Sequence, residues 1–220
     1  RRGAGLGCRI MTSGRLIEGD ADVAEGARWL ASACPRMAAA LEKTGPLPLR
    51  RREDGFAALL NAIVSQQVSV ASARAIWARL ERAGMVSPTA VAAAGSEQLR
   101  SLGLSRQKIR YAEALAIADI DYIALRQMPD AEIIEQLIAV PGIGRWTAEI
   151  YAMFSLGRSD VFAPGDLALQ EAARHLYDLP ERPTEKVLRD MAVAWSPWRS
   201  VAARLLFANY RVIKEREGIS

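Results

Sequence analysis

The stretch Leu137-Ile138-Ala139-Val140-Pro141-Gly142-Ile143-Gly144-Arg145-Trp146-Thr147-Ala148 decides how the rest of the chain is interpreted. One apolar helical pattern ends at Pro141-Gly142, and a second begins directly after Gly144. Glycine permits backbone angles that other residues resist and lets another backbone come close. The N–H groups of such a turn point outward at the positive end of a helix dipole, so the pattern predicts a phosphate site without base preference. A PGxG turn alone is also typical of an ordinary corner between two helices.

Outward from this hairpin the chain is rich in alanine and leucine, and its apolar residues recur every three or four positions. This period predicts an all-α fold without a sheet. Asp54, Ser69, Ser105, Asp166 and Thr184 are side chains that suit the first position of a helix. The expected helices cover 22–43 with a break near Pro35, the regions following Asp54 and Ser69, 88–101, 105–118, 130–138, 145–156, the region following Asp166, 185–195, and 198–214 with Pro197 in the first turn.

Charge and cysteine content narrow the classes of site. The formal net charge is +4 and the isoelectric point about 9.3, which favours an anionic partner without requiring one. Cys8, Cys34 and His175 are too few for a four-cysteine iron–sulfur cluster or a tetrahedral zinc site. We expect reduced thiols rather than a disulfide. His175 lies in a polar helical run without a nucleophile motif, so we expect it to be structural.

The first residues are basic but lack the apolar core of a signal peptide. Met11 is a possible natural start, so we expect residues 1–19 to be a disordered arm or to include a segment foreign to the natural chain. No stretch reaches the roughly 18–20 apolar residues that span a membrane. We therefore expect a cytoplasmic protein with no membrane partner, and a monomer.

A second informative stretch is Asp160-Val161-Phe162-Ala163-Pro164-Gly165-Asp166-Leu167-Ala168-Leu169. Pro-Gly-Asp before a helical pattern places Asp166 at a helix N-terminus, where a capping aspartate contributes about 1 kcal/mol. Taken alone, the motif predicts a cap. Its position after the hairpin, one helix and one loop further along the chain, is what suggests chemistry.

The hairpin, the Gly/Pro-rich loop and the aspartate together resemble the helix-hairpin-helix DNA glycosylase superfamily (HhH-GPD). The resemblance also covers AIVSQQVSVASA (62–73), GLSRQKIRYAEALA (103–116) and WSPWRSVAARLL (195–206). It implies a two-lobed helical domain over 20–220 with a cleft between the lobes. The N- and C-terminal helices would form one lobe, and residues 54–165 would form the other, ending in the hairpin at 130–156. It also implies that Asp166 is the catalytic carboxylate.

Two absences in the sequence select a branch of this superfamily. With two cysteines the chain lacks the four-cysteine cluster of some relatives, and it also lacks a lysine in the second helix of the hairpin. Relatives that also cut the DNA backbone carry a lysine just after the second hairpin glycine, where this chain has Arg145 and Trp146. The chain is similar to the AlkA-type 3-methyladenine DNA glycosylase II branch, in a compact form without the additional N-terminal domain. The resemblance implies a monofunctional hydrolase that flips an alkylated purine, such as 3-methyladenine or 7-methylguanine, out of duplex DNA and leaves an abasic site.

The resemblance assigns further roles by position. Trp146, Phe207 and Tyr151 would line the base pocket, although core packing is an open alternative for each. Gln67 would fill the gap left by the flipped base. The backbone around the hairpin would bind DNA through Gly142, Ile143, Gly144, Arg145 and Thr147. No cofactor is required, but the backbone carbonyls of Ile138, Val140 and Ile143 would hold Na⁺ or K⁺.

Three other functions stay open at this point. One is a DNA-binding module that uses the hairpin without chemistry, which would need neither Asp166 nor Trp146. Another is a monofunctional glycosylase for a different damaged or mismatched base. The third is a helical protein-interaction domain, which the Gly-Ile-Gly turn disfavours.

Overall fold

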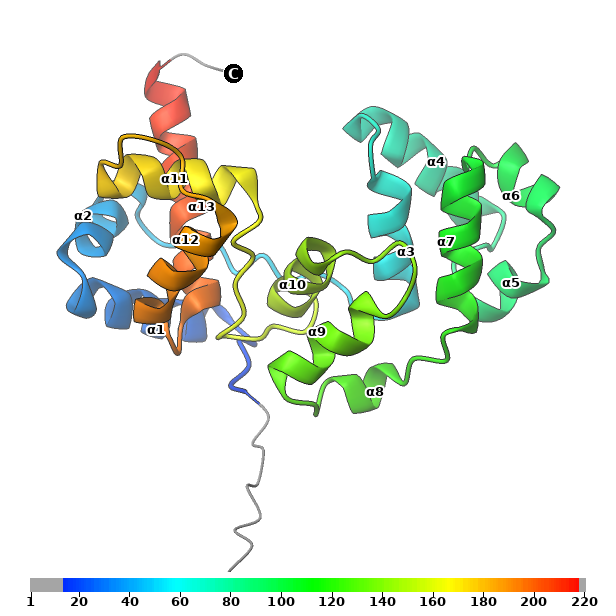
Figure 1. The fold of residues 1–220 in the computed structure, drawn as a ribbon, viewed down its shortest axis with the longest axis horizontal. Coiled ribbons are helices and arrows are strands. Elements are labelled where there is room, and N and C mark those ends of the chain that lie inside the picture. Colours follow the sequence, from blue (N-terminus) through cyan, green and yellow to red (C-terminus); the bar gives the residue numbers. More distant parts are fainter. Residues whose placement is uncertain (1–13, 218–220) are drawn as a thin grey trace, which may run out of the picture.

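The structure is a computed structural model that describes residues 14–217 (Figure 1). Within this range it consists of helices, turns and one isolated antiparallel bridge between Leu16 and Arg158, which confirms the all-α prediction. The elements are α1 (Asp20–Ala33), α2 (Pro35–Thr44), α3 (Phe56–Ser65), α4 (Val70–Arg82), α5 (Pro88–Ala93), α6 (Ser96–Ser101), α7 (Arg106–Ile117), α8 (Tyr122–Leu125), α9 (Asp130–Ile138), α10 (Arg145–Phe154), α11 (Leu167–Tyr177), α12 (Glu185–Met191), the 3₁₀ helix η1 (Ala192–Trp195) and α13 (Arg199–Glu217).

These helices form two groups along the long axis of the molecule (Figure 1). Helices α1, α2, α11, α12 and α13 pack on one another, and we call this group the terminal lobe. Helices α3–α10 form the second group, the hairpin lobe, in which α7 packs on α3 and α5 and α10 packs on α9 and α3. The chain passes between the lobes at residues 45–55, the first linker, and again at residues 155–166, the second linker, so the first and last described helices both belong to the terminal lobe.

Two fully buried arginines hold these crossings. Arg158 donates to the carbonyls of Gly14, Arg126 and Met128 at 2.7–3.2 Å. Arg204 of α13 donates to the carbonyls of Leu49 and Ser200 at 3.0 and 2.9 Å. A guanidinium has five N–H donors and no acceptor, so one side chain can satisfy several buried carbonyls of an irregular segment. Arg204 thereby anchors the first linker to α13, and Arg158, which belongs to the second linker, anchors that linker to the loop between α8 and α9.

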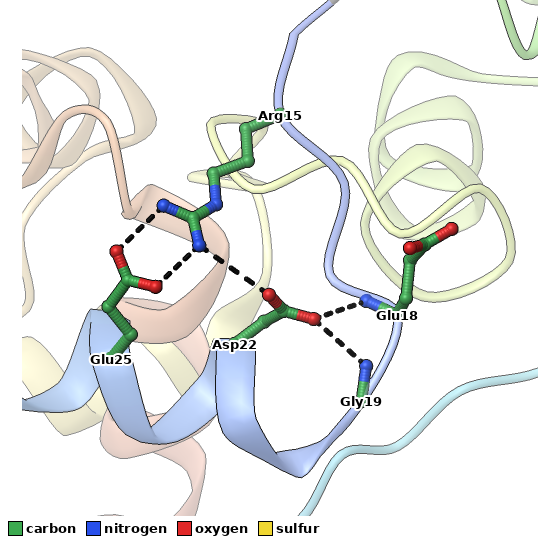
Figure 2. Close-up of polar contacts among 5 residues, drawn as sticks. All are labelled: Arg15, Glu18, Gly19, Asp22 and Glu25. Atoms are coloured by element: carbon green, nitrogen blue, oxygen red, sulfur yellow. Dashed lines mark hydrogen bonds and ion pairs between the residues drawn. The ribbon is translucent and has the colours of Figure 1, made fainter.

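The segment before α1 packs against the second crossing. Ile17 is buried and its N–H donates to the carbonyl of Gly157 at 2.7 Å. Figure 2 shows the Arg15 guanidinium bound to the carboxylates of Glu25 and Asp22, while Asp22 accepts from the N–H groups of Glu18 and Gly19 at 2.9 and 3.0 Å. The expectation of a disordered arm over 1–19 is therefore wrong for residues 14–19, and its remainder lies outside the described residues.

Ser69, Ser105, Asp166 and Thr184 each accept a hydrogen bond from the first turn of the helix that they precede, as predicted. Asp54 does not, and that prediction is wrong. Gly55 is the N-cap of α3, and the Asp54 carboxylate binds Arg126 at 2.6 and 2.7 Å instead.

The start of the last helix also differs from the prediction. Pro197 stands before the first turn, because α13 begins at Arg199. Within residues 14–217, no helix is long and apolar enough to cross a membrane.

Candidate active site and DNA-binding hairpin

The turn between α9 and α10 has the geometry that its glycines predicted. Gly142 has φ +93°, and the N–H of Ile143 closes the turn onto the carbonyl of Val140 at 3.1 Å. Val140 and Ile143 are buried and anchor the turn in the hairpin lobe. Helix α10 then begins with Gly144 as a cap that offers no side-chain acceptor. Among the described residues, the N–H groups of Gly144, Arg145 and Trp146 meet no acceptor, so the exposed helix end is open to an anion.

Two side chains brace this turn from within the hairpin lobe. Gln66 donates through Nε2 to the carbonyl of Gly142 at 2.9 Å. The ring of Tyr111 lies so close to Gly142 that a Cβ there would approach it to 2.4 Å. Gln107 in turn donates to the Tyr111 hydroxyl at 2.7 Å. The turn is thus rigid, and it is tied to the loop that carries the exposed side chain of Gln67, itself in the left-handed region at φ +54°.

The Asp166 carboxylate serves two purposes with its two oxygens. Oδ1 caps α11 by accepting from the N–H groups of Ala168 and Leu169 at 2.9 and 3.1 Å. Oδ2 accepts from the indole Nε1–H of Trp146 at 2.9 Å. Asp166 belongs to the terminal lobe and Trp146 to the first turn of α10 in the hairpin lobe. The structure therefore brings together, across the lobe boundary, two of the residues singled out in the sequence.

A cleft of about 770 Å³ lies beside this contact, bounded mainly by α3, α4 and α10. Trp146, 48% exposed, and Thr147 line it, together with Arg52 and Tyr151. The Tyr151 ring is buried, and its hydroxyl accepts from the N–H of Gly55 at 2.7 Å, so the hydroxyl is already engaged. Asp166 itself is not among the residues that line the cleft, and its carboxylate is connected to the cleft through the hydrogen bond from Trp146.

The sequence matches the model of the HhH-GPD superfamily base excision DNA repair proteins over residues 60–197. The chain belongs to this superfamily. It is 30% identical to DNA-3-methyladenine glycosylase 1 of Schizosaccharomyces pombe over 165 residues, which are 71% of this chain and 72% of that protein.

Solved structures of glycosylases share the fold of this chain. The DNA-3-methyladenine glycosidase of Bacillus halodurans superposes with a TM-score of 0.80 at 31% identity, covering 91% of this chain and 94% of the other. The Schizosaccharomyces pombe 3-methyladenine DNA glycosylase in complex with abasic DNA has a TM-score of 0.71 at 28% identity, covering 83% and 95%. The resemblance inferred from the hairpin and the aspartate is confirmed.

Not every predicted site residue of this HhH-GPD protein lies at the cleft. Phe207 of α13 is not among the residues that line it, and the Arg50 guanidinium lies 5.3 Å from its ring centroid. Gln67 borders a separate hollow of about 260 Å³ beside Lys108 and Tyr111. The roles of Phe207 in the pocket and of Gln67 as the gap-filling residue stay predictions.

The hairpin carbonyls suit an alkali cation, which prefers oxygen ligands. Ile138 is the last residue of α9, so its carbonyl lies among those that a helix end leaves without intrahelical partners. The Val140 carbonyl accepts from the N–H of Ile143 and keeps a second lone pair. Across residues 14–217, side chains of His, Cys, Asp and Glu form no group of three that could hold a metal, so a cation here would rest on backbone oxygens.

Glu149 and Arg189 are two further charged residues of this region that the sequence patterns did not single out. Glu149 of α10 is 3% exposed, and its Oε1 accepts from both terminal nitrogens of Arg189 on α12 at 3.3 Å. Burial raises the pKa of Glu149 to about 6, opposed by the positive charge of Arg189. The only signal in the sequence is an acidic residue inside the apolar run RWTAEIYAMF.

Proposed function

We propose that this chain is a monofunctional DNA glycosylase that hydrolyses the N-glycosidic bond of alkylated purines in duplex DNA. The observation that carries the proposal is the 2.9 Å hydrogen bond from Trp146 to Asp166, made between a hairpin of DNA-repair type and the helix that follows it. It sets an aromatic face and a carboxylate side by side at a helix end open to phosphate. A module that only binds DNA would need neither group.

The chemistry follows from these two side chains. Alkylation at a ring nitrogen makes the purine cationic, so the base leaves as a neutral molecule when the C1′–N bond breaks and takes the electron pair. Positive charge then develops on the deoxyribose, and the Asp166 carboxylate stabilises it. Water adds to C1′ and gives up a proton, which the same carboxylate accepts or passes to solvent. The Trp146 ring attracts the cationic base by roughly 0.5–2 kcal/mol.

DNA would be held mainly through its backbone. The open N–H groups at the start of α10 suit a phosphate, and Arg145 adds a charge beside them. An alkali cation on the carbonyls of Ile138, Val140 and Ile143 would supply further attraction for the same phosphate. The solved complex of the Schizosaccharomyces pombe relative with abasic DNA supports DNA as the partner. One copy of the chain carries the whole arrangement, because Trp146 and Asp166 belong to the same polypeptide.

The reaction should stop at the abasic site. A lyase needs an amine that forms a Schiff base with the sugar. Arg145 and Trp146 occupy the first two positions of α10, and a guanidinium stays protonated whereas an indole is not basic.

A base-release assay tests the proposal. Methylated duplex DNA is incubated with the wild type and with Asp166→Asn, and free 3-methyladenine and 7-methylguanine are quantified together with strand breaks before and after alkali. We expect release by the wild type, near-complete loss in the variant, and breaks only after alkali. Equal release by both proteins would remove Asp166 from the mechanism. DNA binding without release of any base would leave a binding module, and release only from DNA carrying deaminated bases would change the substrate class.

A further inference from the structure

One ion pair crosses the lobe boundary directly behind the contact between Trp146 and Asp166. Glu149 lies one turn after Trp146 on α10, in the hairpin lobe. Its partner Arg189 lies on α12 in the terminal lobe, and Oε1 accepts from both Nη1 and Nη2 at 3.3 Å. Glu149 is not among the residues that line the cleft. The pair is therefore placed to affect how the two lobes meet without reaching a substrate.

The same arginine continues the connection to the loop that carries Asp166. Arg189 donates through Nη2 to Oε1 of Glu185 at 2.7 Å. The other carboxylate oxygen of Glu185 lies 3.3 Å from the position that a Cβ would occupy on Gly165, the residue before Asp166. Hydrogen bonds thus run from α10 through Glu149 and Arg189 to Glu185, whose carboxylate lies beside the loop at Gly165. Helix α10 and this loop are the elements that present Trp146 and Asp166.

Keeping a carboxylate at this place is costly. A buried charge loses hydration, and an ion pair recovers that loss only in part. The neighbours of this carboxylate along α10, Ala148, Ala152 and Met153, are buried apolar residues, and an apolar side chain at position 149 would avoid this cost. The pair joins α10 and α12 by charge attraction and by two directional hydrogen bonds. It therefore restricts the relative position of the two helices more than non-directional apolar contacts would.

We infer that Glu149 and Arg189 are positioning residues that set the distance between Trp146 and Asp166, and thereby the rate of base release. The inference rests on the proposed glycosylase function. A reacting carboxylate is sensitive to small displacements, since a shift of about 1 Å can lower a rate by about 100-fold. DNA affinity depends on the turn at 140–144 and the first turn of α10. Glu149 lies further along the same helix, and its hydrogen bonds run to Arg189 and not to that turn, so the two properties should separate.

The pair should also make the rate depend on pH. Arg189 and Glu185 on α12 and Arg145 on α10 are the charged groups that act on Glu149, and burial raises the pKa of Glu149 to about 6. As the pH falls through this value the carboxylate takes up a proton and the attraction to Arg189 weakens. The wild-type rate should therefore contain a component that is lost between about pH 7 and pH 5.

The test measures the single-turnover rate of 7-methylguanine release and the Kd for the same duplex from pH 5 to pH 8. Glu149→Gln keeps size and an acceptor but removes the charge. At pH 7.5 we expect a rate about tenfold lower, a Kd within about twofold of the wild type, and no component near pH 6. Arg189→Met should behave in the same way, while Arg189→Lys should restore part of the rate and the pH component.

Glu171→Gln is the matched control, because Glu171 pairs with Arg174 inside α11 at 2.6 Å and lies within one lobe. It should leave the rate and the pH profile unchanged. Unchanged rate and profile in Glu149→Gln, or equal losses in rate and affinity, would overturn the inference. If Glu149→Gln does not fold, the partly exposed Arg189 decides through its two variants. A wild type that releases no base would instead refute the glycosylase proposal, and this inference with it.

Discussion

Two helix N-termini meet at the candidate site, and they use their backbone N–H groups in opposite ways. Helix α11 is closed by its own acid, because Asp166 accepts from the N–H groups of Ala168 and Leu169. Helix α10 has Gly144, which has no side chain, as its N-cap, and its first N–H groups stay open. The positive ends of two helix dipoles therefore serve different anions. One fixes the carboxylate for which we propose a catalytic role, and the other is open to a phosphate of the proposed DNA partner.

The largest effect is expected from substitutions of Asp166 that separate its role as the cap of α11 from its proposed catalytic role. Asp166→Asn keeps a good capping residue, so the free energy of unfolding should change by less than about 0.5 kcal/mol, while Asp166→Ala should lower it by about 1 kcal/mol. Both variants should lose base release by a factor on the order of 100–1000, because neither stabilises positive charge. Chemical denaturation and single-turnover release measure the two properties. Activity that followed stability across the variants would mean that Asp166 is only a cap.

The two hairpin glycines offer the next test, because only one of them is required by the fold. Gly142→Ala places a Cβ against the ring of Tyr111 at φ +93°, so we expect a loss of stability of about 2 kcal/mol and weak DNA binding. A Cβ on Gly144 meets nothing within 4 Å. Gly144→Ala should therefore fold normally yet bind undamaged and methylated duplexes about tenfold more weakly, through loss of the close approach. Full DNA affinity in Gly144→Ala, measured by fluorescence anisotropy, would show that the open N–H groups of α10 do not contact phosphate.

The sequence predicts those features of the helix ends whose interacting residues lie a few positions apart along the chain. The caps at Ser69, Ser105 and Thr184 were predictable because each side chain bonds a residue three positions further on. The tight turn at Gly142 was predictable for the same reason. Asp166 was predictable as a cap from its own neighbours, whereas its proposed catalytic role rests on family resemblance. Nothing in residue spacing says that Trp146, 20 positions earlier, donates to it.

The features that were missed or mispredicted depend on partners far along the chain. Asp54 was a plausible cap for α3, but its carboxylate accepts a hydrogen bond from Arg126, 72 positions away. Residues 14–19 were expected to belong to an arm because the chain starts with a basic segment and Met11 is a possible natural start, whereas the backbone of Arg15 and Ile17 pairs with residues 157–159. Glu149 was indistinguishable from a surface acid until α12 placed Arg189 against it, 40 positions later. Local chemistry thus predicts the ends of helices, while the contacts between lobes need the fold.

A smaller effect is expected from the charge beside the open N-terminus. Arg145 is exposed at the first position of α10, with no carboxylate partner among the described residues. Arg145→Gln should weaken DNA binding about fivefold to tenfold and lower the slope of log K against log salt by about 1, equally for any base sequence. Binding isotherms between 50 and 200 mM salt measure this slope, with Arg182→Gln, an exposed arginine of the terminal lobe, as the control. An unchanged slope would place the phosphate elsewhere.

The smallest effect on the rate of base release is expected from loss of the hydrogen bond between Trp146 and Asp166. Trp146→Phe keeps an aromatic face toward the cleft but removes the N–H that donates to Oδ2 of Asp166. A hydrogen bond of this kind contributes about 0.5–1 kcal/mol net, so the rate of base release should fall about threefold, with DNA affinity unchanged. Trp146→Ala removes the face as well and should cost considerably more of the rate. Equal rates in the Phe and Ala variants would show that the ring makes no contact with the base. In that case the 2.9 Å bond would be all that Trp146 contributes, and the cap at Asp166 would orient the carboxylate nearly by itself.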